Sequence, residues 1–189
     1  MRIETGDILL VNRDGFLPDT IEDFQSIQEK EGAEFHHAGN MYCPNTSIQS
    51  VFEAEMMKCE FTSFKKYIES DAQLMILKPK KKLRQLEKEM IEKIIWDELL
   101  DLPYDYSNLF IHQVVKLLSL IIQKEPKWIG KDKNNAAKRF ACGELVAYIY
   151  WRVRDYFENW NMAAPIDLYM SHHFDKYLYN KKTKELIKV

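Results

Sequence analysis

Residues 139–150 read Arg139-Phe-Ala-Cys142-Gly-Glu-Leu-Val-Ala-Tyr-Ile-Tyr150. A polar, aperiodic segment ends here and an apolar stripe at helical spacing begins. The stripe consists of Cys142, Leu145, Val146, Ile149 and Val153. We therefore predict a helix over residues 142–156 that begins at Cys142.

A cysteine at the start of a helix has two chemical uses. The unpaired N–H groups and the positive end of the helix dipole stabilise a thiolate, which is the nucleophilic form of the side chain. The same N–H groups can bind the oxyanion of a tetrahedral intermediate. Because Cys142 also opens an apolar stripe, an inert core cysteine explains this segment equally well.

The candidate base lies in His36-His37-Ala-Gly, at the start of a predicted strand. Neighbouring strand residues point to opposite faces, so only one of the two histidines can face Cys142. A catalytic histidine needs a polar group to orient it, and Glu53 on the next predicted strand is one candidate. Glu55 has the same parity as Glu53, so the strand pattern does not choose between them. Considered alone, a histidine at a strand edge is more often a surface residue.

A zinc site is the competing use of these residues, with His36 or His37 joined by Cys43 and Cys59. Their spacings match no standard ligand pattern, so we predict neither a metal nor a cofactor. The pair His172-His173 is expected at the surface. Three cysteines without a C-x-x-C pair also make a disulfide framework unexpected.

The chain is expected to form one α+β domain over residues 1–189, because strands and helices are mixed without regular βαβ alternation. Predicted strands cover residues 7–11, 36–42, 50–54, 72–77, 177–179 and 186–189. Predicted helices cover residues 18–30, 61–68, 83–100, 109–123 and 142–156, and a turn is expected at residues 165–168. The apolar helix at 109–123 is expected to be core, with an acyl groove or a peripheral membrane contact as the alternative.

Charge and composition exclude several classes of partner. With 27 basic and 29 acidic side chains the net charge is −2, so we expect no nucleic-acid partner. The basic run at residues 78–84 is expected to be a solvated loop rather than a lipid-phosphate site. The N-terminal residues have no apolar signal segment and no stretch is long enough to span a bilayer, which predicts a cytoplasmic protein. The sequence leaves the oligomeric state open.

Several motifs together resemble a known family. Those resembling the latter half of an NlpC-type cell-wall cysteine peptidase are Gly6-Asp7-Ile-Leu-Leu, His37-Ala-Gly and Val51-Phe-Glu53-Ala. Those resembling its first half are Leu102-Pro-Tyr104-Asp-Tyr and Phe140-Ala-Cys142-Gly-Glu. Because the halves occur in reversed order, the chain resembles the circularly permuted papain-like amidases of the YiiX/YaeF group. The segment Pro165-Ile-Asp-Leu-Tyr-Met-Ser171 also resembles that group's C-terminal part.

The resemblance implies a papain-like cysteine hydrolase with a small antiparallel sheet packed against the nucleophile helix. In it, Cys142 is the nucleophile, His37 the base, Glu53 the orienting group and Tyr104 the tyrosine that can donate to the oxyanion. The implied reaction cleaves an amide or ester of a small-molecule, peptide-like or fatty-acyl substrate through a thioester. The alternatives are an acyltransferase with a lipid or amine acceptor and a non-catalytic binding module. Gly143 departs from the pattern, because serine usually follows the cysteine.

Overall fold

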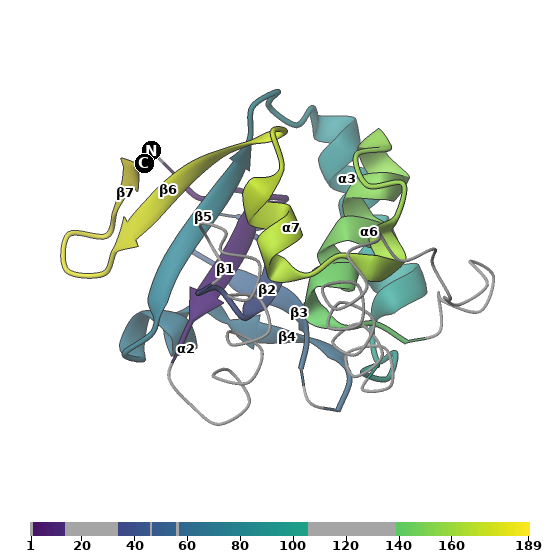
Figure 1. Ribbon diagram of the computed structural model, residues 1–189, viewed down its shortest axis with the longest axis horizontal. Helices are drawn as coiled ribbons and strands as arrows, with labels where there is room; N and C mark the ends of the chain where they lie inside the picture. Colours follow the sequence, from purple (N-terminus) through teal and green to yellow (C-terminus); the bar gives the residue numbers. More distant parts are fainter. Residues whose placement is uncertain (1, 14–33, 46, 56, 106–138) are drawn as a thin grey trace, which may run out of the picture.

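A seven-stranded antiparallel sheet forms the centre of the protein, and its strand order is β4-β3-β2-β1-β5-β6-β7 (Figure 1). The computed structural model describes residues 2–13, 34–45, 47–55, 57–105 and 139–189. The strands are β1 (Ile8–Asn12), β2 (His37–Tyr42), β3 (Ser50–Ala54), β4 (Cys59–Ser63), β5 (Gln73–Pro79), β6 (Phe174–Asn180) and β7 (Glu185–Lys188). The helices are α2 (Phe64–Glu69), α3 (Gln85–Ile94), the π-helix η1 (Ile95–Leu99), α6 (Cys142–Arg154), the short 3-10 helix η2 (Trp160–Met162) and α7 (Pro165–Met170).

Both faces of the sheet are buried, which explains the uninterrupted apolar run of β1. Its residues pair with β2 on one side and β5 on the other, and Ile8, Leu9, Leu10 and Val11 are all buried. Ile8 and Leu10 join the core cluster that contains α6, whereas Leu9 and Val11 join the cluster that contains α2. Alternate side chains of β1 therefore belong to two separate cores.

The first core is built around α6. Its buried side chains pack on β2 and β3, and α3 and α7 lie against the helix (Figure 1). Arg154 near its end makes a buried two-point ion pair with Glu87 of α3, with the Nε to Oε1 distance at 2.9 Å. These contacts fix the axis of α6 relative to the sheet and so fix where its first residue lies.

The second core lies under the opposite face of the sheet. Phe64 and Tyr67 of α2 pack there against Met41 and Val51, and Tyr179 packs edge-on against Phe64. This small helix follows β4 directly, so it turns back over the strands that carry the candidate histidine and carboxylate.

The α+β fold class and the antiparallel sheet packed on the cysteine helix are confirmed, with three local corrections. Residues 59–63 form a strand and only residues 64–69 are helical, where one helix over 61–68 was expected. The expected turn at 165–168 is the start of α7, since Pro165 occupies a position that helices accept. In the predicted helix 83–100, Leu86 and Met90 are exposed, because α3 turns Ile91 and Ile94 inward.

The helix 83–100 also changes to a π-helix at Ile95. The helices predicted at 18–30 and 109–123 lie outside the described residues. Within the described part of the chain, no helix combines the length and apolar character needed to cross a bilayer.

Candidate active site

The first turn of α6 places Cys142 beside the start of β2. Cys142 is 6% exposed, and its Sγ lies 3.9 Å from the carbonyl oxygen of His36. The backbone N–H of Ala141 donates to Oε2 of Glu144 at 2.9 Å, which closes the start of the helix. Just before it, Phe140 is fully buried and packs against Trp160 at 5.7 Å between ring centroids. The residues before and after Cys142 in the chain are thus fixed by their own contacts.

His37 joins the cysteine to a buried carboxylate. Its Nε2 lies 2.8 Å from Oε2 of Glu53, whose side chain is completely buried, whereas the His37 side chain is 19% exposed. Burial acts to lower the pKa of His37, but hydrogen bonds to Cys142 and Glu53 and the charges of both groups raise it well above its usual value. Since Nε2 faces Glu53, the other ring nitrogen is the one available to Cys142.

Glu53 remains ionised although it is buried. Burial raises its pKa, but hydrogen bonds from His37, Thr62 and Tyr67 together with the charge of His37 bring the pKa below its usual value. The Tyr67 hydroxyl donates to the same Oε2 at 2.5 Å. A buried anion beside a histidine of raised pKa is the arrangement that stabilises an imidazolium.

The structure chooses between the two candidate carboxylates. Glu53 pairs with Gly39 in the β2–β3 ladder, which sets it diagonally across from His37 on the same face of the sheet. Glu55 lies beyond the end of β3 and forms an ion pair with Lys66 at 3.2 Å. The two residues have the same parity along the chain, but only Glu53 lies within β3.

Tyr104 lies close to Cys142 through its backbone. It forms a parallel bridge with Phe140, two residues before Cys142, and the N–H of Asp105 donates to the carbonyl of Phe140 at 3.1 Å. Asp105 itself is completely buried. All four residues singled out in the sequence therefore belong to one region of the molecule.

Tyr67 is the contact that the sequence did not indicate. It lies in a segment whose spacing predicted one continuous helix, and a tyrosine in such a stripe normally signals core packing. Only the turn between β4 and α2 brings its hydroxyl to Glu53.

Potential ligand atoms of His37, Glu53 and Glu55 lie within 4.8 Å of one another. Among the described residues, neither Cys43 nor Cys59 belongs to such a group of ligand atoms. The structure therefore does not form the zinc site with a histidine, Cys43 and Cys59 that the sequence suggested as a competing use. Both of these cysteines are poor nucleophiles, because burial raises the pKa of Cys43 to about 11 and that of Cys59 to about 12.

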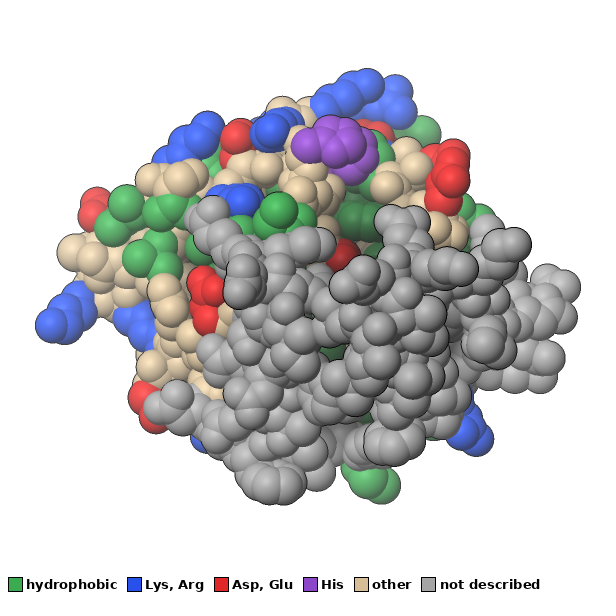
Figure 2. Space-filling model, viewed as in Figure 1, with side chains coloured by type: hydrophobic (Ala, Val, Ile, Leu, Met, Phe, Trp, Pro, Cys, Tyr) green, Lys and Arg blue, Asp and Glu red, His purple; other side chains and the backbone are tan. Residues whose placement is uncertain are grey.

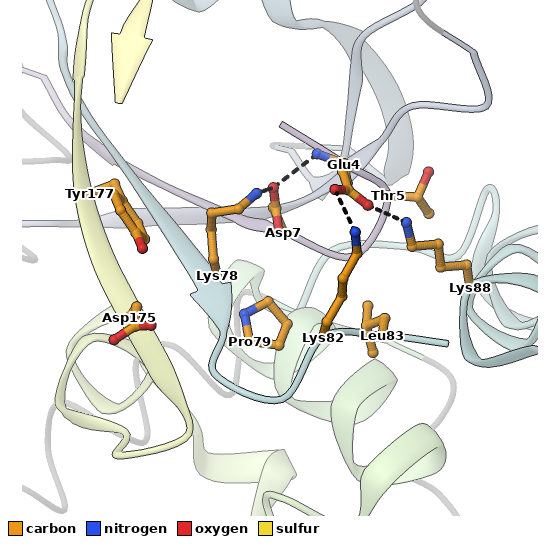
Figure 3. A pocket seen from close by; sticks show the side chains of 10 residues that line it. All are labelled: Glu4, Thr5, Asp7, Lys78, Pro79, Lys82, Leu83, Lys88, Asp175 and Tyr177. Carbon is orange, nitrogen blue, oxygen red and sulfur yellow. Dashed lines mark hydrogen bonds and ion pairs between the residues drawn. The ribbon is translucent and has the colours of Figure 1, made fainter. Parts of the chain in front are cut away.

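A separate pocket of about 280 Å³ lies beside the residues that lead into β1, and its lining includes Asp7, Lys78 of β5 and Tyr177 of β6. Figure 3 shows three lysines of this pocket directed at two acidic side chains: Lys78 contacts Asp7, and Lys82 and Lys88 contact Glu4. Each of these lysines is therefore paired with an acidic side chain of the same pocket. In Figure 2 the basic side chains along the upper edge of the described surface likewise have acidic side chains between them.

The strand that begins with His37 precedes, along the chain, the helix that begins at Cys142, and the helix packs on the antiparallel sheet. This α+β fold is of the YiiX type. One matching solved structure is described as that of the metalloprotein yiiX from Escherichia coli O157:H7. The likeness has a TM-score of 0.61 at 14% identity and covers 92% of this chain and 95% of yiiX. No model of a protein family matches the sequence, and no curated protein matches it. The predicted YiiX resemblance is thus confirmed at the level of the fold.

Proposed function

We propose that this protein is a cysteine hydrolase that cleaves an amide or ester bond through a thioester intermediate. One observation carries the proposal: His37 lies 2.8 Å from the buried, ionised carboxylate of Glu53, while Cys142 lies beside the residue before His37 and helps to raise the pKa of His37. A nucleophile, a base and a group that orients the base are the three parts that this chemistry requires.

In the proposed reaction the Cys142 thiolate attacks the acyl carbonyl carbon of the substrate. Electrons of the C=O bond move onto oxygen, and the oxyanion lies at the N–H groups of the first turn of α6, with Tyr104 as a further donor. Collapse of this intermediate expels the amine or alcohol, which takes its proton from the His37 imidazolium. The product is a thioester on Cys142.

Water completes the cycle. Neutral His37 removes a proton from water as the oxygen attacks the thioester carbonyl, and the second tetrahedral intermediate releases the carboxylic acid and the thiolate. Glu53 keeps its negative charge throughout and stabilises the imidazolium in each half-reaction. Replacing water by a lipid or amine acceptor would give the related acyltransferase with the same residues.

The substrate that fits this chemistry is a small peptide-like or fatty-acyl amide or ester. We place the reaction in the cytoplasm, as the sequence led us to expect, with peripheral membrane contact for an acyl-lipid substrate. A non-catalytic module of the same fold would have no need of an ionised carboxylate buried beside the histidine, because burying such a charge is costly.

A metal-dependent function is the second candidate, because the solved structure of the same fold is described as a metalloprotein. The residues fit a metal poorly. Two ligand atoms on one tetrahedral zinc lie about 3.3 Å apart, whereas His37 Nε2 and Glu53 Oε2 are 2.8 Å apart, a distance that suits a shared proton. Glu55 is paired with Lys66. We therefore derive no step through a metal.

The test is covalent labelling of the whole protein with electrophilic acyl probes, followed by mass spectrometry of the modified residue. We expect the label on Cys142, loss of labelling in Cys142→Ala and in His37→Ala, and unchanged labelling in the matched variant Cys43→Ala. Labelling of the wild type at Cys43 or Cys59 alone would reject the proposal. Bound metal at one equivalent, together with probe labelling that chelation abolishes, would favour the second candidate.

A further inference from the structure

Tyr67 offers a contact to the active site that the hydrolase mechanism does not itself require. Its side chain is 7% exposed, and its hydroxyl donates to Oε2 of Glu53 at 2.5 Å, the same oxygen that lies 2.8 Å from His37 Nε2. One carboxylate oxygen thus contacts both the tyrosine hydroxyl and the histidine ring nitrogen. A rotation of the carboxylate would break both contacts together.

We propose that Tyr67 is a positioning residue of the catalytic relay, which sets the orientation and basicity of Glu53 and through it the state of His37 and Cys142. This inference rests on the proposed function. Tyr67 touches neither the substrate nor the reacting atoms, so its effect on the reaction passes through Glu53.

The chemistry of a phenol suits this role. Burial and the negative charge of Glu53 both raise the pKa of Tyr67, so the hydroxyl stays protonated and can only donate to the carboxylate. A donor to the anion lowers the basicity of Glu53, which keeps the proton on the imidazole nitrogen instead of passing it to the carboxylate. The imidazolium is the partner that the Cys142 thiolate needs.

The rigidity of the surroundings makes the contact specific. Tyr67 belongs to α2, whose Phe64 packs under β3 in the same core as Val51. The Ser70 hydroxyl donates to the carbonyl of Tyr67 at 2.8 Å and ties down the end of this short helix. The backbone and the ring of Tyr67 are therefore fixed by the hydrogen bond and by the core, while its hydroxyl contacts Glu53.

The test measures the rate of Cys142 alkylation by iodoacetamide against pH, which requires no knowledge of the substrate. The protein is the full chain, as wild type, Tyr67→Phe, Glu53→Gln and the double variant. Tyr179→Phe is the matched control, because it removes another hydroxyl from the same core.

In Tyr67→Phe we expect the rate at pH 6.5 to fall about fivefold, since a hydrogen bond to a charged group is lost. The acid limb of its pH profile should move to higher pH, because Glu53 is no longer held against His37 and the imidazolium that stabilises the Cys142 thiolate is weakened. The double variant should equal Glu53→Gln alone, and Tyr179→Phe should equal the wild type.

The outcomes separate the two proposals. If wild-type Cys142 reacts no faster than a free thiol at neutral pH, the hydrolase proposal fails. If wild-type Cys142 is reactive and Tyr67→Phe has the same profile, or if the two substitutions act additively, the positioning role of Tyr67 is rejected.

A second variant covers the case in which Tyr67→Phe does not fold. With Tyr67 replaced by 3-fluorotyrosine the ring and hydroxyl remain, and the more acidic phenol donates more strongly. The acid limb should then move to lower pH, and a limb that stays in place or moves upward overturns the inference.

Discussion

Gly143 lies directly against the backbone of Ala164. A Cβ on Gly143 would lie 2.8 Å from the carbonyl carbon and 2.9 Å from the Cα of Ala164, and it would also clash with the carbonyl oxygen of Ala163. The residue after Cys142 is therefore glycine because the segment leading into α7 passes over the first turn of α6. This close approach explains the departure from the serine that the family resemblance led us to expect.

Gly143→Ala should destabilise the protein by about 3 kcal/mol, as expected for overpacking against a fixed backbone. The sign is informative, because the same substitution inside an unobstructed helix stabilises by about 1 kcal/mol. Urea unfolding of wild type and variant measures the difference. A variant as stable as the wild type would mean that residues 163–164 move away freely.

Cys142 should react with iodoacetamide at pH 6.5 at least about tenfold faster than the other two cysteines. The thiols of Cys43 and Cys59 have pKa values raised by burial, to about 11 and about 12, and so hold almost no thiolate at that pH. Peptide mapping after timed labelling gives the three rates. The urea-unfolded chain is the control, in which the three rates should become similar, and equal rates in the folded protein would contradict the assignment of the nucleophile.

Glu53→Gln should lower kcat by on the order of 100-fold, because the imidazolium loses its buried counter-charge and the amide can turn its NH₂ toward the ring. Cys142 should remain alkylatable. The matched control is Glu55→Gln, which removes a nearby carboxylate that pairs with Lys66. Turnover of any acyl substrate measures the effect, and equal kcat values for wild type and Glu53→Gln would show that something else holds His37.

Glu87→Gln should cost about 3 kcal/mol at pH 7, because it leaves the buried Arg154 without its partner. The hydrogen bond from Arg154 is the main cause that lowers the pKa of Glu87 to about 2. A lowered folded-state pKa gives stability that is complete above the ordinary carboxyl range and is lost as pH falls toward 2.

The difference in unfolding free energy between wild type and Glu87→Gln should therefore shrink between pH 4.5 and pH 2. Glu98→Gln is the matched control. It breaks the other ion pair between a glutamate and an α6 arginine, but its partners Glu98 and Arg152 are both 36% exposed, so its cost should stay below about 1 kcal/mol. Equal costs for the two substitutions would contradict the buried role of Arg154.

Local patterns in the sequence determined most of the elements. The apolar runs of β1 and β5 and the stripe that begins at Cys142 predicted two strands and a helix close to their observed bounds. These predictions succeed because the two strands and the helix are buried. Burial imposes a period of 2 on a strand and 3.6 on a helix, and this period is visible in the sequence. The pair His36-His37, the candidate carboxylates and Cys142 were visible for the same reason, as polar groups set in apolar elements.

Tertiary structure alone decided how these groups meet. The end of β3 after Ala54 selects Glu53 over Glu55, because one carboxylate continues the ladder and the other turns toward Lys66. The turn between β4 and α2 delivers Tyr67 to Glu53, and the approach of Ala164 explains Gly143. These contacts join residues that are distant in the chain. A local sequence pattern does not predict which distant backbone segment or hydroxyl will contact a given side chain. Periodicity reports that a side chain is buried, whereas only the packed fold determines which group it is buried against.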